Sequence, residues 1–302
     1  MRIAVGVDAG GTSTVAAVSG DGDLLRKRNG PPSNASSHGI RTAGTAIADT
    51  ILESLEGASP NAIYVGAAGA GRTEVARELE IFLLGRFPNA AIHVRDDAHI
   101  ALRAGVPHGD ASVLVAGTGS IAYAEVGAEC FRSGGYGYLV GDDGSGFSIG
   151  AAAIKHVLRT HDGRVPRDDF ADAIEKQLDA RSPMDILDRV YAGEGAVALV
   201  ASLAPVVLEL ANSGARFAAR IVQQAALDLS DLLKGLAKRS GIGGSSPIVF
   251  AGGLLRENSM LSFLVESRLH SDLPDMAIHK NAIDPALCAM SLADRLACGA
   301  PT

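Results

Sequence analysis

The chain has 302 residues, of which 47% are hydrophobic, and its formal net charge is −7. A chain of this length can bury a substantial core, and its size favours two domains over one. The acidic balance argues against nucleic acid as the main partner, because phosphate backbones are bound mostly by Lys and Arg. A single nucleotide stays compatible, since backbone amides and a divalent cation can neutralise one triphosphate locally.

The first third of the chain alternates β-prone and helical segments. Strands are expected at 3–7 and 15–18, joined by a glycine turn, and Asp21-Gly22 predicts a hairpin into a further strand from residue 24. A loop rich in Pro, Ser and Asn follows at 30–37. Beyond it we expect, in chain order, a helix over 39–55, a strand over 62–68, a helix over 73–87, a strand over 91–95 and a helix over 98–104.

A second glycine hairpin, with strands at 113–115 and 121–124, opens the rest of the chain. The densest region of glycines and carboxylates comes next, and apolar residues at helical spacing predict a helix from about Ser145. Further along we expect mainly helix over 166–239, a buried strand over 247–251 and a closing helix over 285–298.

The cysteines and the longest apolar stretch bear on cellular location. Cys130, Cys288 and Cys298 are odd in number and lack C-x-x-C spacing, so we expect free thiols in a reducing compartment and no zinc site. The N-terminus lacks the pattern of a secretory signal. The stretch 196–208 is shorter than a membrane span and contains Pro205, which favours a buried, kinked core helix. The sequence therefore predicts a cytoplasmic protein without a membrane partner.

The two glycine turns share one design. Gly10-Gly11-Thr12 and Gly117-Thr118-Gly119 each lie between two strand-like runs. Glycine lets the backbone approach an anion closely, and the N–H groups of such a turn point into its concavity. Two of these turns could hold a polyphosphate between two half-domains. The chain has neither a G-x-G-x-x-G turn followed by a helix nor a P-loop, which argues against those nucleotide-binding folds.

Aspartates at strand ends are the candidates for proton and metal chemistry. Asp97 follows a strand and heads a helix, where a carboxylate can accept a proton from a substrate hydroxyl. The competing interpretation of Asp97 is a helix N-cap, a role we expect instead for Asp96. Asp8 follows an apolar strand, and this favours a metal, or water around a metal, over a turn cap.

Asp142 and Asp143 are adjacent, so on most backbones only one of them faces a site. We expect Asp142 to bind substrate and Asp143 to cap the helix that follows. The histidines show no metal-binding spacing, and His99 and His156 are expected on helix surfaces.

In their order and spacing, the glycine and aspartate motifs resemble a known family. The motifs are Asp8-Ala9-Gly10-Gly11-Thr12, Asp97, Gly117-Thr118-Gly119-Ser120, the run from Gly134 to Ser145, and Ala251-Gly252-Gly253. The chain resembles the BadF/BadG/BcrA/BcrD ATPase family, in the N-acetylglucosamine kinase branch of the superfamily of sugar kinases, heat-shock proteins and actin. The resemblance covers nearly the whole chain.

The resemblance implies an α/β fold of two ribonuclease-H-like domains with ATP and Mg2+ in the cleft between them. It also implies transfer of the γ-phosphoryl group to the 6-hydroxyl of an amino sugar. The domains would be 1–108, with a closing helix at 285–302 packing back on it, and 109–284 with a helical insertion. Asp97 would be the catalytic base and Asp8 would face the metal. ATP would be held by Gly10, Gly11, Thr12, Thr14, Gly117, Thr118 and Gly119, with Gly252 and Gly253 against the adenosine. The sugar would be bound by Ser33, Asn34, Asp97, Thr118, Gly134, Gly135 and Asp142.

Two other functions compete with the kinase. An activator of 2-hydroxyacyl-CoA dehydratases or benzoyl-CoA reductases needs cysteines that bridge an iron-sulfur cluster, and the cysteines of this chain do not match those positions. A sugar-responsive regulator of the related families carries an added DNA-binding segment, whereas this chain begins at its first strand. The sequence does not separate N-acetylglucosamine, glucosamine, N-acetylmuramic acid and glucose. The resemblance further implies a homodimer, with 182–239 as the candidate interface.

Overall fold

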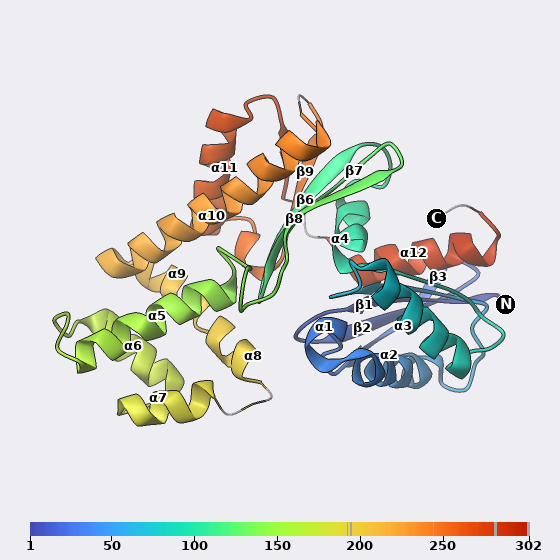
Figure 1. Cartoon of the computed structure of the whole chain (residues 1–302). Helices are drawn as coiled ribbons and strands as arrows, with labels where there is room; N and C mark the ends of the chain where they lie inside the picture. The colour runs from blue at the N-terminus through green and yellow to red at the C-terminus, as the bar shows by residue number, and fades with distance from the viewer. Residues whose placement is uncertain (192, 194, 244, 281–282, 301–302) are drawn as a thin grey trace. The chain divides into compact units, whose positions relative to one another are not determined.

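The computed structural model describes residues 1–191, 193, 195–243, 245–280 and 283–300. The chain forms two compact units, the first made of Met1–His108 with Ile283–Thr302 and the second of Gly109–Ala282 (Figure 1). Each unit contains one five-stranded sheet. In the described ranges no single helix has the length and apolar content needed to cross a bilayer. Only one pair meets that test jointly, Ala196–Asn212 with Arg216–Ser240, and it is bent by 116°.

The first unit has a mixed sheet in the order β3-β2-β1-β4-β5. Its strands are β1 (Ile3–Ala9), β2 (Thr14–Gly20), β3 (Asp23–Gly30), β4 (Ala62–Ala67) and β5 (Ala91–Asp96). Its helices are α1 (Ala35–His38), α2 (Ile40–Leu55), α3 (Thr73–Arg86), α4 (Asp97–Gly105) and α12 (Pro285–Ala297). β2 is antiparallel to β1 and β3, whereas β4 runs parallel to β1 and β5 parallel to β4.

Strand β1 is buried on both faces of the sheet. Its successive side chains point to opposite faces, and each face is covered by helices. Val5 and Val7 join the core formed with α2 and α3, whereas Ala4 packs in the cluster that contains residues of α4 and α12. At Gly6 the helix α12 comes so close that an added Cβ would lie 1.8 Å from the backbone nitrogen of Met290. The returning helix α12 therefore holds the middle of the strand that ends in Asp8 and the first glycine turn.

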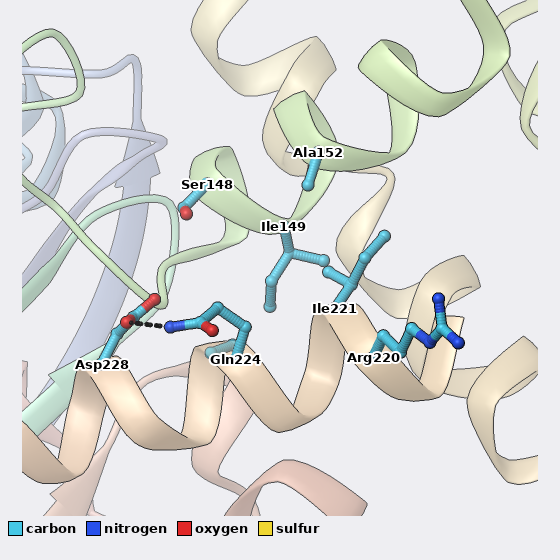
Figure 2. A pocket seen from close by; sticks show the side chains of 8 residues that line it. Ser148, Ile149, Ala152, Arg220, Ile221, Gln224 and Asp228 are labelled. Carbon is cyan, nitrogen blue, oxygen red and sulfur yellow. Dashed lines mark hydrogen bonds between the residues drawn. The ribbon is translucent and has the colours of Figure 1, made fainter. Parts of the chain in front are cut away.

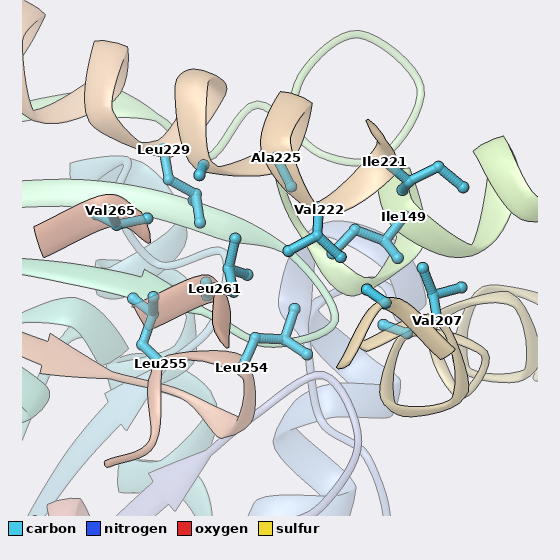
Figure 3. Close-up of a cluster of buried hydrophobic side chains, with 14 of the residues drawn as sticks. Ile149, Val207, Ile221, Val222, Ala225, Leu229, Leu254, Leu255, Leu261 and Val265 are labelled. Atoms are coloured by element: carbon cyan, nitrogen blue, oxygen red, sulfur yellow. The ribbon is translucent and has the colours of Figure 1, made fainter. Parts of the chain in front are cut away.

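The second unit repeats this topology in the sheet order β10-β9-β6-β7-β8. Its strands are β6 (Ala111–Ala116), β7 (Ser120–Val126), β8 (Glu129–Gly134), β9 (Pro247–Ala251) and β10 (Ala277–His279). Its helices are α5 (Gly146–His161), α6 (Asp169–Leu178), α7 (Pro183–Val190), α8 (Ala196–Ala201), α9 (Ala204–Asn212), α10 (Arg216–Ser240) and α11 (Met260–Asp272), with a short 3-10 helix η1 (Gly253–Leu255). Side chains from α5, α9, α10, η1 and α11 meet in one core, drawn in Figure 3.

Most predicted elements are confirmed by the structure. Both glycine turns join antiparallel strands, and the Asp21-Gly22 turn joins β2 to β3. The helix expected near Ser145 begins there, since the Ser145 hydroxyl accepts a hydrogen bond of 3.2 Å from the N–H of Ser148. Strands β8 and β10 and helix α11 were not predicted. The kinked helix expected over 196–208 is confirmed in its main feature: helical segments α8 and α9 are separated at Ser202-Leu203, and Pro205 lies in the first turn of α9.

The expectation that His99 and His156 lie on helix surfaces is wrong. Both side chains are buried, at 6% exposure each. His99 Nε2 lies 3.0 Å from the Tyr64 hydroxyl oxygen in the first unit. His156 stacks on the ring of Phe217 and places Nε2 3.1 Å from an Asp168 carboxylate oxygen in the second unit. Buried polar groups need such partners, so both histidines have structural roles.

Candidate active site

The first glycine turn connects β1 and β2 and leaves backbone donors open. Gly10 donates its N–H to the carbonyl of Ser13 at 2.9 Å, which closes the turn. In the described part of the chain, the N–H groups of Gly11 and Thr12 have no hydrogen-bond partner, and both residues are exposed. A turn with exposed, unpaired N–H groups can bind an anion such as a phosphate.

The loop expected to bind sugar is attached to this turn. Ser33 is buried, donates its N–H to the Gly10 carbonyl at 3.1 Å, and has its hydroxyl 2.5 Å from that of Thr14. The Thr14 hydroxyl in turn donates to the carbonyl of Pro31 at 2.6 Å. The hydroxyls of Thr14 and Ser33 are therefore engaged inside the protein in this structure, and their first role is to fix the loop on the turn.

Asn34 caps the short helix α1. Its Oδ1 accepts hydrogen bonds from the N–H groups of Ser36 at 2.8 Å and Ser37 at 3.3 Å. The amide nitrogen of Asn34 faces the turn, since a Cβ added to Gly11 would lie 3.9 Å from it. Ser33, Asn34 and the predicted phosphate residues of the first unit thus meet in one place.

Asp8 is the last carboxylate before the turn, and its environment disfavours charge. Burial is the largest cause that raises the pKa of Asp8 from the ordinary value of 3.8 to about 6. The charge of Asp284 raises the pKa further, and Lys27 opposes both effects. Lys27 Nζ lies 2.5 Å from Asp284 Oδ2. A buried carboxylate with an unfavourable charge is a group that a bound cation would stabilise.

Asp97 lies where β5 passes into α4. The expected N-cap is Asp96, which accepts a hydrogen bond of 2.9 Å from the N–H of Ala98, and this leaves Asp97 free of the capping role. Burial, and then the charge and a hydrogen bond of Asp96, hold the pKa of Asp97 well above its ordinary range. The charge of Asp8 acts in the same direction. Asp8 and Asp97 are therefore near neighbours, and Asp97 has the basicity of a proton acceptor.

The second glycine turn connects β6 and β7. Gly117 donates its N–H to the carbonyl of Gly119 at 2.9 Å, while the carbonyls of Gly117 and Thr118 accept from Gly146 and Phe147, at the start of α5. Within the described ranges the N–H groups of Thr118 and Gly119 have no partner. The start of α5 thus fixes the turn, and the turn keeps two donors for a ligand.

Asp142 faces this turn. Its carboxylate accepts hydrogen bonds from the N–H groups of Gly137, at 3.3 Å, and Ser120. A Cβ added to Gly119 would lie 2.7 Å from Asp142 Oδ2, so only glycine allows this approach. Burial raises the pKa of Asp142 despite these bonds. Asp143 is exposed and does not cap α5, a role that belongs to Ser145; the expected cap is therefore wrong.

The remaining predicted residues lie at two strand ends of the second unit. Gly134 ends β8, and Gly134 and Gly135 both have left-handed backbone angles, with φ of 73° and 68°. Gly252 and Gly253 follow β9 and are exposed. A Cβ added to Gly252 would lie 2.3 Å from the carbonyl oxygen of Ala116, the residue before the second turn. Gly252 is therefore placed beside the phosphate-type turn.

Sequence reasoning missed two groups. Arg132 contacts the Gly134–Gly135 turn, and Lys27 pairs with Asp284 beside Asp8. A signal existed for Asp284, because an Asp directly before Pro285 at the start of a predicted helix is typical of an N-cap. Asp284 indeed accepts a hydrogen bond of 3.1 Å from the N–H of Leu287. Nothing in the local pattern marked Lys27 or Arg132.

A pocket between α5 and α10 is a separate feature. Its volume is about 200 Å³, below the range of roughly 300–1,000 Å³ that is usual for small-molecule sites. In Figure 2 the side chains of α5 and α10 line it, and Gln224 donates to Asp228 at 2.8 Å. No predicted site residue lines this pocket. Among the described residues, no group of three or more His, Cys, Asp and Glu side chains lies close enough together to bind a metal ion.

Comparisons with known proteins show similarity along nearly the whole chain. The profile of the BadF/BadG/BcrA/BcrD ATPase family matches residues 5–290. An N-acetyl-D-glucosamine kinase of Dictyostelium discoideum is 30% identical, covering 97% of this chain and 98% of its own. An N-acetylmuramic acid/N-acetylglucosamine kinase of Clostridium acetobutylicum is 29% identical, covering 97% and 98%.

A solved structure from Chromobacterium violaceum, provisionally named an N-acetylglucosamine kinase, shares the fold of this chain. Its TM-score is 0.78 at 24% identity, with 97% of this chain and 99% of that chain covered. This likeness and the two sheets of matching order confirm the predicted α/β fold with two ribonuclease-H-like domains.

Proposed function

Because the chain belongs to the BadF/BadG/BcrA/BcrD ATPase family, we propose that it is an ATP-dependent amino-sugar kinase. It transfers the γ-phosphoryl group of ATP to the 6-hydroxyl of N-acetylglucosamine or glucosamine. Full-length relatives with N-acetylglucosamine kinase names support the substrate class. The observation that carries the chemistry is the raised pKa of Asp97, to which the charge of Asp8 contributes. Asp8 is the second residue before the first glycine turn, whose N–H groups are open to a phosphate.

Phosphoryl transfer depends mainly on positioning and on neutralising charge. The open N–H groups of Gly11, Thr12, Thr118 and Gly119 bind phosphate oxygens of ATP. Asp97 accepts the proton of the attacking sugar hydroxyl as the new O–P bond forms and the bond to the leaving ADP breaks. Asp142 accepts a hydrogen bond from another sugar hydroxyl and so orients the ring.

Mg2+ is part of the proposal. Asp8 supplies the hard carboxylate oxygen that Mg2+ prefers, and its buried charge is one that a cation would neutralise. Mg2+ usually keeps several waters and binds one or two carboxylates plus substrate phosphates, so it does not need a cluster of three protein ligands. When bound, the ion neutralises charge on the transferring phosphoryl group.

The oligomeric state and location complete the proposal. We propose that the protein forms a homodimer through residues 182–239, where the hydrophobic side chains of Met184, Tyr191 and Leu227 are exposed. Sedimentation equilibrium measures the molecular mass in solution and so tests the dimer. A cytoplasmic location is supported by the need for ATP and by three cysteines without disulfides.

A substrate panel tests the function. ADP release is measured with N-acetylglucosamine, glucosamine, N-acetylmuramic acid and glucose, each with Mg2+ and ATP, and phosphorus NMR locates the phosphate on the product. The 6-deoxy analogue of N-acetylglucosamine is the matched control, because it keeps the ring but lacks the acceptor. ADP release that no sugar stimulates, or product phosphorylated elsewhere than at carbon 6, would refute the proposal.

A further inference from the structure

The side chain of Arg132, near the end of β8, contacts the loop that follows this strand. Its Nη2 donates hydrogen bonds to two successive carbonyls, those of Gly134 at 3.1 Å and Gly135 at 2.5 Å. Its guanidinium carbon lies 5.5 Å from the centre of the Tyr136 ring, within the range of a cation–π contact. One side chain therefore contacts three consecutive residues of the loop that contains the predicted sugar contacts.

The loop that Arg132 contacts has several residues with left-handed backbone angles. Gly134, Gly135 and Gly137 all have positive φ, and so does Asp142, with φ of 57°. A non-glycine residue with this backbone is uncommon and persists only where its surroundings impose it. The Asp142 carboxylate also accepts the N–H of Gly137, so the position of Asp142 depends on the course of the loop before it.

Arg132 acts on Asp142 through charge as well. Burial is the largest cause that raises the pKa of Asp142; hydrogen bonds from backbone N–H groups lower it, Asp143 raises it, and Arg132 adds a smaller lowering effect. Arg132 Nε is buried and, in the described part of the chain, has no hydrogen-bond partner. A buried donor without a partner costs free energy, which indicates that the guanidinium is placed for more than packing.

On the premise of the proposed kinase function, on which this assignment rests, we propose that Arg132 is a positioning residue for the amino sugar. It holds the Gly134–Gly135 turn and the Asp142 carboxylate in the geometry that binds the sugar hydroxyls. The planar guanidinium matters for this task, because it directs donors at two carbonyls and stacks on a ring, which an ammonium group does not reproduce. Loss of Arg132 therefore weakens sugar binding and leaves nucleotide binding intact.

The test compares Arg132→Met and Arg132→Lys with Arg239→Met as the matched control. Arg239 is an exposed arginine whose Nη1 donates to the Arg132 carbonyl at 2.8 Å, and it has no hydrogen bond to the two glycine carbonyls. Arg132→Met is expected to raise the KM for the sugar at least tenfold with the KM for ATP within twofold of the parent. Arg132→Lys recovers part of this loss, and Arg239→Met changes the sugar KM by less than twofold.

A pH profile gives a readout that a merely structural role would not move. Because Arg132 lowers the pKa of Asp142, its removal makes the carboxylate protonate at higher pH. The rise of the sugar KM on acidification should then start at a higher pH in Arg132→Met than in the parent protein. If Arg132→Met does not fold, Arg132→Gln provides the same comparison, because it also removes the positive charge.

The outcomes separate the two proposals. An unchanged sugar KM, or sugar and ATP KM values that rise together, overturns the role of Arg132 while the kinase function stands. A parent protein that no sugar stimulates overturns the kinase function itself, and then calorimetric binding of N-acetylglucosamine to the parent and to Arg132→Met still tests the sugar loop.

Discussion

Replacing Asp8 with asparagine should stabilise the apoprotein at neutral pH while removing metal-dependent nucleotide binding. Asparagine has nearly the shape of aspartate but carries no charge. The fold raises the pKa of Asp8 from 3.8 to about 6, mainly by burial. One pKa unit corresponds to about 1.4 kcal/mol, so the charged form costs the folded state about 3 kcal/mol.

The sign of the pH dependence follows from the direction of this shift. Between pH 3.8 and about 6 the folded state binds more protons at Asp8 than the unfolded state does, so the contribution of Asp8 to stability falls as pH rises through this window. Below the window the carboxyl is neutral in both states. The stability of Asp8→Asn relative to the parent should therefore increase by about 2.5 kcal/mol from pH 4 to pH 7 and stay nearly level above it.

Urea denaturation of the apoproteins at several pH values measures this difference. Asp49→Asn, at an exposed position of α2, is the control and should stay within about 0.5 kcal/mol of the parent throughout. Magnesium and ATP should then stabilise the parent and fail to stabilise Asp8→Asn. A stability difference that does not change between pH 4 and pH 7 would show that Asp8 is not the strained carboxylate inferred from its burial.

Three further predictions concern the reaction. Asp97→Asn should lower kcat by roughly 10²–10⁴-fold with little change in nucleotide affinity, whereas Asp96→Asn should mainly destabilise α4, by about 1 kcal/mol; steady-state kinetics and denaturation separate the two. Because the pKa of Asp97 is raised and the base must be ionised, kcat/KM should fall on acidification at a pH above the ordinary range of aspartate; a profile flat to pH 4 contradicts this. Gly119→Ala places a Cβ 2.7 Å from Asp142 Oδ2 and should raise the sugar KM at least tenfold, more than Gly117→Ala, whose Cβ meets nothing within 4 Å.

The elements around the two turns were predictable because their signals are local. A short apolar run followed by glycines fixes a strand and its end, and Ser145 before an apolar helical period marks the start of α5. The expected N-cap role of Asp96 is confirmed, although the expected start of the helix was one residue late: α4 begins at Asp97 rather than at Ala98, and its cap is the residue before it.

Contacts between distant segments were not predictable in the same way. Thr14 and Ser33 share a hydrogen bond across 19 residues, and Lys27 pairs with Asp284 across 257. These partners meet only because β3 returns along β2 and α12 packs back on β1, which is a property of the whole first unit. The predicted surface location of His99 and His156 was wrong for the same reason. The depth at which a helix is buried is set by the elements packed against it and not by its own sequence pattern.

The repeated topology explains why two similar turns differ in chemistry. By sheet order β1 corresponds to β6, and β5 to β10. The second residue before the turn is Asp8 in the first unit and Val115 in the second. Strand β5 ends in Asp96 and leads into Asp97, whereas β10 ends at His279. The shared backbone therefore supplies open N–H donors twice, since these depend on turn geometry alone. The strand-end carboxylates Asp8 and Asp97 therefore have no counterparts at these positions of the second unit, where the carboxylate beside the turn is Asp142, from the loop between β8 and α5.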